Sequence, residues 1–385
     1  MSIRKIFLLG CMAAAAALAL SQPASARPRW TAAEANSWNA KQPWFLGANY
    51  LPSNAINELE MWQKESFDPK RIDQEFGWAQ GIGMNVMRVF LHNALWEQDP
   101  DGFKQRMNAF LDIAARHKIK IMFVLFDSCW DPDYQLGPQR APTPGVHNSG
   151  WVQAPGAKIL DDPSKYPALK AYVTGVVGAF ARDPRVFAWD VWNEADNGGG
   201  GNYKNNPKDK FERVQTLLPQ VFDWVRSMDP VQPLTSGVWH DADWSPSAKL
   251  NAIERIQLDQ SDIISFHDYS WPEEFETRIK QLTPYGRPLI CTEYMARGMG
   301  STFDTVTPIG KKSNIGMINW GFVAGKSQTI LPWDSWVKPY TYKVEPQPIW
   351  FHDIFHADGT PYRQREAQIL KTLSGAPKGV VPSAY

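Results

Sequence analysis

The sequence predicts a single-domain α/β fold, a (β/α)8 barrel of the TIM type, on three observations. Eight short apolar runs rich in Val, Ile and Phe are spread along the chain, each followed by a loop or by a segment with helical spacing. The 385 residues suffice for one such barrel with insertions. Right-handed crossovers leave few other arrangements for eight parallel strands. An open doubly wound sheet is the alternative, but the first run ends in Gly47-Ala48-Asn49-Tyr50, which is no glycine-rich phosphate turn.

The eight apolar runs define the expected strands, and helical spacing between them defines the expected helices. In chain order the strands are 45–51, 85–91, 119–126, 186–193, 233–239, 263–269, 288–294 and 316–322. The helices are 69–81, 103–117, 163–182, 211–228, 272–282 and 364–373. Long connections follow Leu46, Phe126, Glu194 and Phe322. Because the active sites of this fold lie at the C-terminal ends of the strands, polar residues that end each run are the candidate site residues.

The N-terminal residues are typical of a secretion signal. Two basic residues, a short apolar stretch and an Ala-Ser-Ala cleavage site ending at Ala26 follow one another in the expected order. We therefore expect a signal peptide over 1–26, a catalytic domain over 27–385, and a secreted or periplasmic protein. A transmembrane helix is disfavoured because the apolar run is shorter than the ~20 residues that a bilayer span needs. A lipoprotein signal at Cys11 is the other alternative.

Composition narrows the class of partner. Without residues 1–26 the chain has 38 basic and 40 acidic residues, which does not favour nucleic acid or an anionic membrane. Cys129 and Cys291 are too few for a disulfide scaffold, and the apolar surroundings of Cys291 indicate a buried thiol; whether the two pair stays open. The 18 tryptophans suggest a sugar-binding cleft, because flat rings stack on the C–H faces of pyranoses. We expect an oligo- or polysaccharide substrate, no cofactor, no metal, and a monomer by default.

Two glutamates that end apolar runs carry the predicted chemistry. Glu194 ends the run that begins at Trp189, and Glu293 ends the run that begins at Leu289. Retaining cleavage of a glycosidic bond needs two carboxyl groups about 5 to 5.5 Å apart, one to attack the anomeric carbon and one to protonate the leaving oxygen. Glutamates that end the fourth and seventh strands can face each other across a barrel mouth. Solvated loop carboxylates are the alternative interpretation.

The motifs around the two glutamates resemble clan A of the glycoside hydrolases, near the cellulase family (family 5) and related β-1,4-xylanase and endoglucanase barrels. They are Trp192-Asn193-Glu194 on the fourth strand and Thr292-Glu293-Tyr294 on the seventh. The resemblance covers nearly the whole mature chain. It implies that Glu194 is the acid/base, Glu293 the nucleophile, and Asn193 a hydrogen-bond partner of the sugar 2-hydroxyl.

The same resemblance places an arginine beside the nucleophile. Arg88 in Met87-Arg88-Val89 matches the strand-two arginine of the clan. A guanidinium beside Glu293 would lower the pKa of that carboxyl, whereas an acid/base needs a raised pKa. We therefore expect Glu293 and Glu194 to have unlike surroundings.

Other residues at the strand ends are predicted to bind the substrate. By the resemblance, His267 and Tyr269 form the strand-six His-x-Tyr element, and Trp320 lies under the sugar next to the scissile bond. Their positions after strands add Asn49, His240 and Trp130. The chain departs from the family at 127–130, where Asp-Ser-Cys-Trp stands in a region that often holds a histidine.

Together these features predict a retaining β-glycoside hydrolase, endo-acting on a β-linked polysaccharide of the β-1,4-xylan, glucan or mannan type. Tryptophans in segments that follow strands suggest several sugar-binding subsites: Trp130, Trp151, Trp244, Trp271, Trp333 and Trp336. Two alternatives stay open, an exo-acting glycosidase or transglycosylase with the same residues and a non-catalytic carbohydrate-binding barrel. A metal site at His352 and His356 is disfavoured because no third ligand is evident and a turn follows at once.

Overall fold

The computed structural model describes residues 26–341 and 348–383. The expected signal peptide therefore lies outside the described residues, apart from Ala26, and stays a prediction. None of the helices in the described ranges is long and apolar enough to cross a membrane.

All eight expected strands are present in one parallel sheet. They are β1 (Leu46–Asn49), β2 (Val86–Phe90), β3 (Lys120–Val124), β4 (Val186–Asp190), β5 (Leu234–Thr235), β6 (Ile264–His267), β7 (Leu289–Glu293) and β8 (Gly316–Asn319). The strand order is β5-β4-β3-β2-β1-β8-β7-β6, so the first strand lies between the second and the eighth. A parallel bridge between Val238, beyond β5, and Phe266 in β6 joins the two edges. The barrel is nearly closed, which confirms the predicted fold class.

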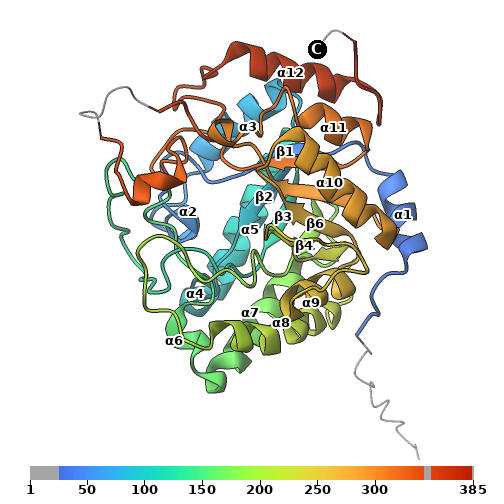
Figure 1. Cartoon of the computed structure of the whole chain (residues 1–385). Helices are drawn as coiled ribbons and strands as arrows, with labels where there is room; N and C mark the ends of the chain where they lie inside the picture. The colour runs from blue at the N-terminus through green and yellow to red at the C-terminus, as the bar shows by residue number, and fades with distance from the viewer. Residues whose placement is uncertain (1–25, 342–347, 384–385) are drawn as a thin grey trace, which may run out of the picture.

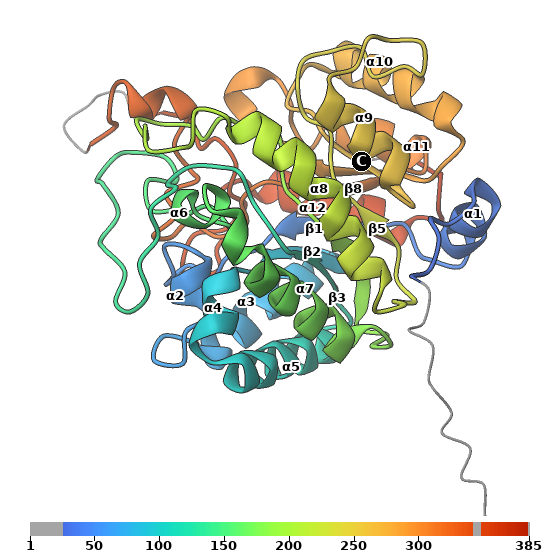
Figure 2. The ribbon, with the colours of Figure 1, turned by 90° about the horizontal axis from the view of Figure 1, so that it is seen from below.

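Helices follow the strands and surround the barrel (Figures 1 and 2). The six expected ones are α3 (Pro69–Gly81), α5 (Pro100–Arg116), α7 (Tyr166–Phe180), α8 (Lys210–Arg226), α10 (Pro272–Leu282) and α12 (Gln364–Gly375). The expected helix 163–182 also covers the 3-10 turn η1 (Pro163–Lys165) that precedes α7. The sequence interpretation missed shorter elements: α1 (Ala32–Ala40), α2 (Glu58–Trp62), α4 (Asn93–Gln98), α6 (Ala157–Leu160), α9 (Ala252–Gln260), α11 (Thr307–Lys312) and the 3-10 turns η2 (Thr283–Tyr285), η3 (Arg297–Met299) and η4 (Trp333–Trp336).

Local capping explains where helices begin. Asp68 accepts hydrogen bonds from the backbone of Lys70 and Arg71, and Pro69 follows at the first helical position, so the start of α3 is readable from the sequence. Helix α9 begins with an equally clear capping box between Asn251 and Glu254. Its nine residues hold too few apolar positions for the helical period to be recognised.

The interior of the barrel is apolar at its N-terminal end. Alternate strand residues point inward, and those at this end form one buried cluster with the residues that precede the strands: Ala35, Phe45, Val86, Met122, Phe187, Ala188, Ile263, Ile290 and Ile318. Helix α1 covers this end, where Trp38 stacks on Phe187 with ring centroids 6.5 Å apart. A second, larger apolar layer lies between the strands and the outer helices. The long connections after β3, β4 and β8 lie at the opposite end of the barrel.

Candidate active site

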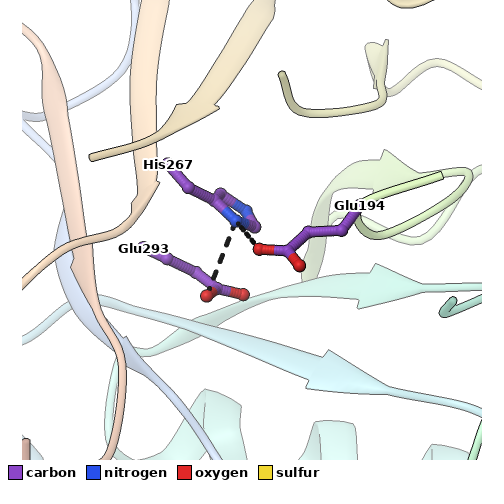
Figure 3. A group of neighbouring side chains, drawn as sticks. All are labelled: Glu194, His267 and Glu293. Carbon is purple, nitrogen blue, oxygen red and sulfur yellow. Dashed lines mark hydrogen bonds and ion pairs between the residues drawn. The ribbon is translucent and has the colours of Figure 1, made fainter. Parts of the chain in front are cut away.

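The two predicted glutamates lie at the C-terminal end of the barrel. Glu194 follows β4 and has a left-handed backbone, with φ of 43°, which is uncommon for a residue other than glycine. Glu293 is the last residue of β7. Both are buried, with exposed fractions of 9% and 5%. One carboxylate oxygen of each and a ring nitrogen of His267 lie within 4.8 Å of one another, and the His267 ring lies beside the two carboxylates and reaches toward both (Figure 3).

Glu293 is held by a cation and a phenol. Arg88 donates from Nη1 to Oε1 at 2.9 Å, and the Tyr269 hydroxyl donates to Oε2 at 2.7 Å. Nδ1 of His267 is 3.5 Å from Oε2. A charged donor on one oxygen and a hydroxyl on the other orient the carboxylate and favour its ionised form.

Arg88 is fully buried and serves several acceptors. Its Nε and Nη2 donate to Oδ2 of Asp190 at 3.0 and 2.8 Å. Nη1 also donates to Oδ1 of Asn49 at 2.8 Å, and Nη2 donates to Oδ1 of Asn193 at 2.6 Å. A buried cation needs partners of this kind, because an unpaired one costs several kcal/mol. The guanidinium is therefore held in one orientation against Glu293.

Glu194 has only neutral partners. Its Oε1 lies 2.8 Å from Nδ1 of His267, and its Oε2 accepts from Nδ2 of Asn197 at 2.6 Å and from the Cys129 thiol at 3.1 Å. Burial lowers the pKa of His267 to about 4, so the ring is neutral near neutral pH. No cation touches this carboxyl.

The electrostatic comparison of the two glutamates corrects one expectation. Burial raises the pKa of Glu194, against the hydrogen bonds from Asn197 and Cys129. Burial also raises the pKa of Glu293, although the Arg88 charge opposes the rise. The expected net lowering at Glu293 was wrong, because removing a carboxylate from water outweighs one buried cation shared with a second acid. The surroundings of the two glutamates are nevertheless unlike, since Arg88 contacts Glu293 and does not contact Glu194.

A cavity of about 270 Å³ opens over the two glutamates. His147 and the loop after Glu194 form part of its lining. Much of the rest is tryptophan: Trp130, Trp151, Trp239, Trp320 and Trp333. Trp320 meets Trp151 edge to face, with ring centroids 5.8 Å apart. The predicted residues Asn193, Tyr269, Trp130 and Trp320 all line this cavity.

Several of the predicted substrate-binding residues lie outside the cavity lining, Trp336 among them. Asn49 supports Arg88 and donates to the Thr292 and Asn319 carbonyls, so its side chain is occupied within the protein. His240 contacts Oδ2 of Asp196 at 3.0 Å, outside the cavity lining. Trp244 is buried in the apolar layer between strands and helices. Trp271 is 61% exposed and does not line the cavity.

Other residues around the glutamates were given no role by the sequence interpretation, although Asp127 directly follows the third apolar run. Asp190 pairs with Arg88, and Asp127 accepts from Asn193 at 2.9 Å and from the Trp151 indole at 2.6 Å. The available signal for Asp190 was an acid inside an apolar strand run. Cys129 carried no such signal, because a thiol reads as an apolar residue until its neighbours are known.

The trio of Glu194, His267 and Glu293 also has the spacing of metal ligands, and no other such group occurs within 26–341 and 348–383. Its four carboxylate oxygens already have partners from the protein, including a guanidinium. The two histidines of the 352–356 segment do not form a site together, since His352 is buried against the Met295 carbonyl and His356 is exposed beside Trp350. Cys129 and Cys291 are both free and buried.

Comparison of the whole chain with known proteins gives matches in three dimensions only. No family model matches the chain, and no curated protein matches its sequence. A GH5_18 variant from Streptomyces cattleya, solved with Manβ1-4GlcNAc, aligns over 88% of this chain and 82% of that one, with a TM-score of 0.56 and 12% identity. An endo-β-1,4-mannanase from Thermotoga petrophila aligns over 88% and 77%, with a TM-score of 0.53 and 14% identity. A glycoside hydrolase family 5 mannosidase from Rhizomucor miehei aligns over 86% and 92%, with a TM-score of 0.51 and 13% identity.

At identities this low, the structural alignments show a shared fold and nothing finer. Two of these three structures carry the family 5 name, and the barrel fold that the resemblance implied is confirmed.

Proposed function

We propose that this protein is a retaining β-glycoside hydrolase in which Glu293 is the nucleophile and Glu194 the acid/base. The observation that carries the proposal is the pair of buried carboxylates with oxygens within 4.8 Å, of which only Glu293 touches a cation. Inverting enzymes hold their carboxyl groups about 6.5 to 9.5 Å apart to admit a water, so the short separation favours the retaining route.

The reaction has two steps. The Glu293 carboxylate attacks the anomeric carbon while the bond to the leaving oxygen breaks, and Glu194 gives its proton to that oxygen. The resulting glycosyl ester removes the charge of Glu293, so the pKa of Glu194 falls and this residue becomes a base. Glu194 then takes a proton from water, the water oxygen attacks the same carbon, and the Glu293 carboxylate leaves. Two inversions return the original configuration.

The neighbouring side chains fit these roles. Arg88 and Tyr269 hold Glu293 at both oxygens, which favours the ionised form needed for attack. Glu194 contacts neutral groups in a buried position, and burial raises its pKa, which is the direction that an acid requires. The tryptophan-lined cavity supports a sugar substrate. The mannosidases and mannanases that share the fold make a β-linked mannose chain the first candidate, ahead of glucan and xylan.

The test is hydrolysis of aryl β-glycosides and β-1,4-linked oligosaccharides by residues 27–385, with and without a chelator, with product anomers followed by NMR. We expect the β anomer first and no effect of the chelator. Glu194→Ala should keep activity on substrates with good leaving groups and should yield a β-glycosyl azide when azide is added, because azide can enter the space left by the base.

Glu366→Ala is the matched control. This buried glutamate on α12 pairs with Arg297 of η3, and neither residue lines the cavity. It should show wild-type kinetics and no azide product. An α-configured first product, or full activity of Glu194→Ala without any response to azide, would contradict the mechanism.

A further inference from the structure

One side of the cavity is closed by two chain segments that meet over the barrel. We call them the β3–β8 wall: residues 143–151 of the connection after β3 and residues 325–340 of the connection after β8. In Figures 1 and 2 the loop after β3 and the segment around η4 lie side by side, on the side of the molecule away from α1. Trp151, His147 and Trp333 of this wall line the cavity.

Hydrogen bonds join the two segments along their length. The Asn148 amide donates to the Ser327 carbonyl at 2.8 Å, and the Tyr340 amide donates to the Gly145 carbonyl at 2.8 Å. Gln328 donates from Nε2 to the carbonyls of residues 143 and 146 at 2.8 and 2.9 Å. The buried His147 donates its amide to Ser335 Oγ at 2.9 Å, and its Nδ1 lies 2.8 Å from the carbonyl of residue 331. So many ordered bonds make this a fixed wall.

The wall continues into the connection after β4. Trp130 stacks on Trp336 with centroids 5.2 Å apart and planes 17° apart, and Tyr203 meets Trp336 edge to face. The glycine-rich segment 198–201 passes close over the Trp336 ring, since a Cβ at Gly201 would lie 2.8 Å from it. The φ of Gly201 is also positive, a conformation that favours glycine. The Trp130 amide also donates to the Gly199 carbonyl at 2.7 Å.

The other side of the cavity, around Trp239, is bordered by a short connection, and Trp333 of the wall reaches toward it: Trp333 meets Tyr269 edge to face with ring centroids 5.0 Å apart. The connection between β6 and α10 is only the four residues 268–271. Trp239 after β5 lines the cavity and is half-buried, with its indole held by Asp196 at 2.7 Å. The half-exposed His240 and the exposed Trp271 lie beyond it.

The scissile bond lies between these two sides. The sugar that is attacked must sit over Glu293, beside Trp320, whose amide bonds to the carbonyl of residue 294. That sugar then faces Trp151 of the β3–β8 wall. The leaving group must extend past Glu194, toward Asn197 and Trp239. The cavity volume of about 270 Å³ falls just below the roughly 300 to 1,000 Å³ of pockets that hold drug-sized ligands.

We propose that the site holds one sugar on the side of the nucleophile and therefore removes single residues from the non-reducing end of β-linked oligosaccharides. This inference rests on the proposed function and replaces the endo-acting mode expected from the sequence. Chain on the non-reducing side of the attacked sugar would run into Trp151, His147 and the segments that meet there. Chain on the reducing side can leave through the open side near Trp239.

The test uses hexasaccharides of β-1,4-linked mannose, glucose and xylose, each labelled at the reducing end, with the products resolved in time. We expect unlabelled monosaccharide and labelled pentasaccharide as the first products, then successively shorter labelled chains. Blocking the 4-hydroxyl at the non-reducing end of the cleaved hexasaccharide should abolish cleavage. Early release of unlabelled di- or trisaccharides with retained configuration would overturn the inference and leave the proposed function intact. Failure to cleave these substrates and all the aryl β-glycosides would overturn both.

Opening the wall gives an independent readout. Trp336→Ala removes the ring on which Trp130 and Tyr203 pack, and it should add disaccharide to the products without changing the anomer. Trp38→Ala is the matched control, because this half-buried tryptophan covers the opposite end of the barrel, and its products should stay monosaccharides. Equal product patterns from the two variants, both with disaccharide, would contradict the role of the wall.

Discussion

The two ends of the barrel interior are built by the same strands and differ completely in chemistry. In β2 the three inward positions are Val86 in the apolar cluster at the N-terminal end, Arg88 in the middle, and Phe90 against Trp151 and Trp320 in the cavity wall. In β4 the change from Ala188 to Asp190 is just as abrupt. One end of the barrel is therefore a packed core, and the other holds buried charge.

The difference shows what each end contributes. Burying a large apolar side chain stabilises the fold by about 1.5 to 3 kcal/mol, so the N-terminal end favours folding directly. Buried ion pairs add little net stability, and apolar replacements of similar size are often neutral or better. The cluster of Arg88, Asp190, Glu293 and Glu194 is thus explained by chemistry, and four predictions test this division.

The largest effect is expected at the nucleophile. Glu293→Gln should lower kcat/KM by on the order of 10⁴-fold or more, because no other group can form the glycosyl ester. The amide keeps the side-chain volume but replaces one acceptor oxygen by an NH2 donor, while Arg88 keeps Asp190 as its ionic partner, so the free energy of unfolding should fall by only about 1 to 3 kcal/mol. Kinetics and thermal unfolding of one preparation measure both. Activity close to that of the wild type would remove Glu293 from its role.

Arg88→Leu should affect both activity and stability. It leaves Asp190 and Glu293 buried without a cation, which should cost about 3 to 5 kcal/mol of unfolding free energy together with most of the turnover. Replacing Asp190 by Leu in the same chain should restore much of the stability and none of the activity. Denaturant unfolding and kcat/KM of the single and double variants separate the two effects. Recovery of activity in the double variant would contradict this account.

Phe187→Ala probes the apolar end alone. Its ring packs on Phe45 at 4.7 Å, so truncation should cost about 3 to 5 kcal/mol. Below the unfolding transition kcat/KM should stay at the wild-type value, since the ring lies at the end of the barrel opposite the cavity. A large loss of activity in a folded sample would show that the two ends are coupled.

The smallest effect concerns the thiol beside the acid/base. Burial keeps the pKa of Cys129 well above its usual range, so the neutral thiol donates a weak hydrogen bond to Glu194. A Ser hydroxyl donates more strongly and stabilises the carboxylate, whereas Ala removes the donor. The reaction needs protonated Glu194, so activity is lost as pH rises through its pKa.

Cys129→Ser should therefore move the alkaline limb of the kcat/KM profile to lower pH, and Cys129→Ala should move it to higher pH. Activity at the optimum should stay within about tenfold of the wild type, as expected when one weak hydrogen bond is altered. Shifts in the same direction for both variants would indicate a packing effect in place of the hydrogen bond.

The barrel was readable from the sequence because its signals are local. Alternating or continuous apolar runs identify strands, and helices such as α3 carry their own caps, so neither needs long-range information. Short elements such as α2 and α11 were missed, since five or six residues span fewer than two helical turns and show no repeat of the apolar spacing. The two glutamates and Arg88 were found because a charge inside or at the end of an apolar run is unusual in sequence.

The site was only partly readable for the same reason. Cys129 contacts Glu194 across 65 residues of sequence, and His147 contacts the carbonyl of residue 331 across 184. No local pattern marks either partner, and the tryptophans carry no sign that separates Trp151 in the cavity from Trp244 in the core. By itself the sequence determined the barrel and the pair of carboxylates at its mouth. Only the tertiary structure decided which side of that mouth is closed, because closure depends on loops that meet far apart along the chain.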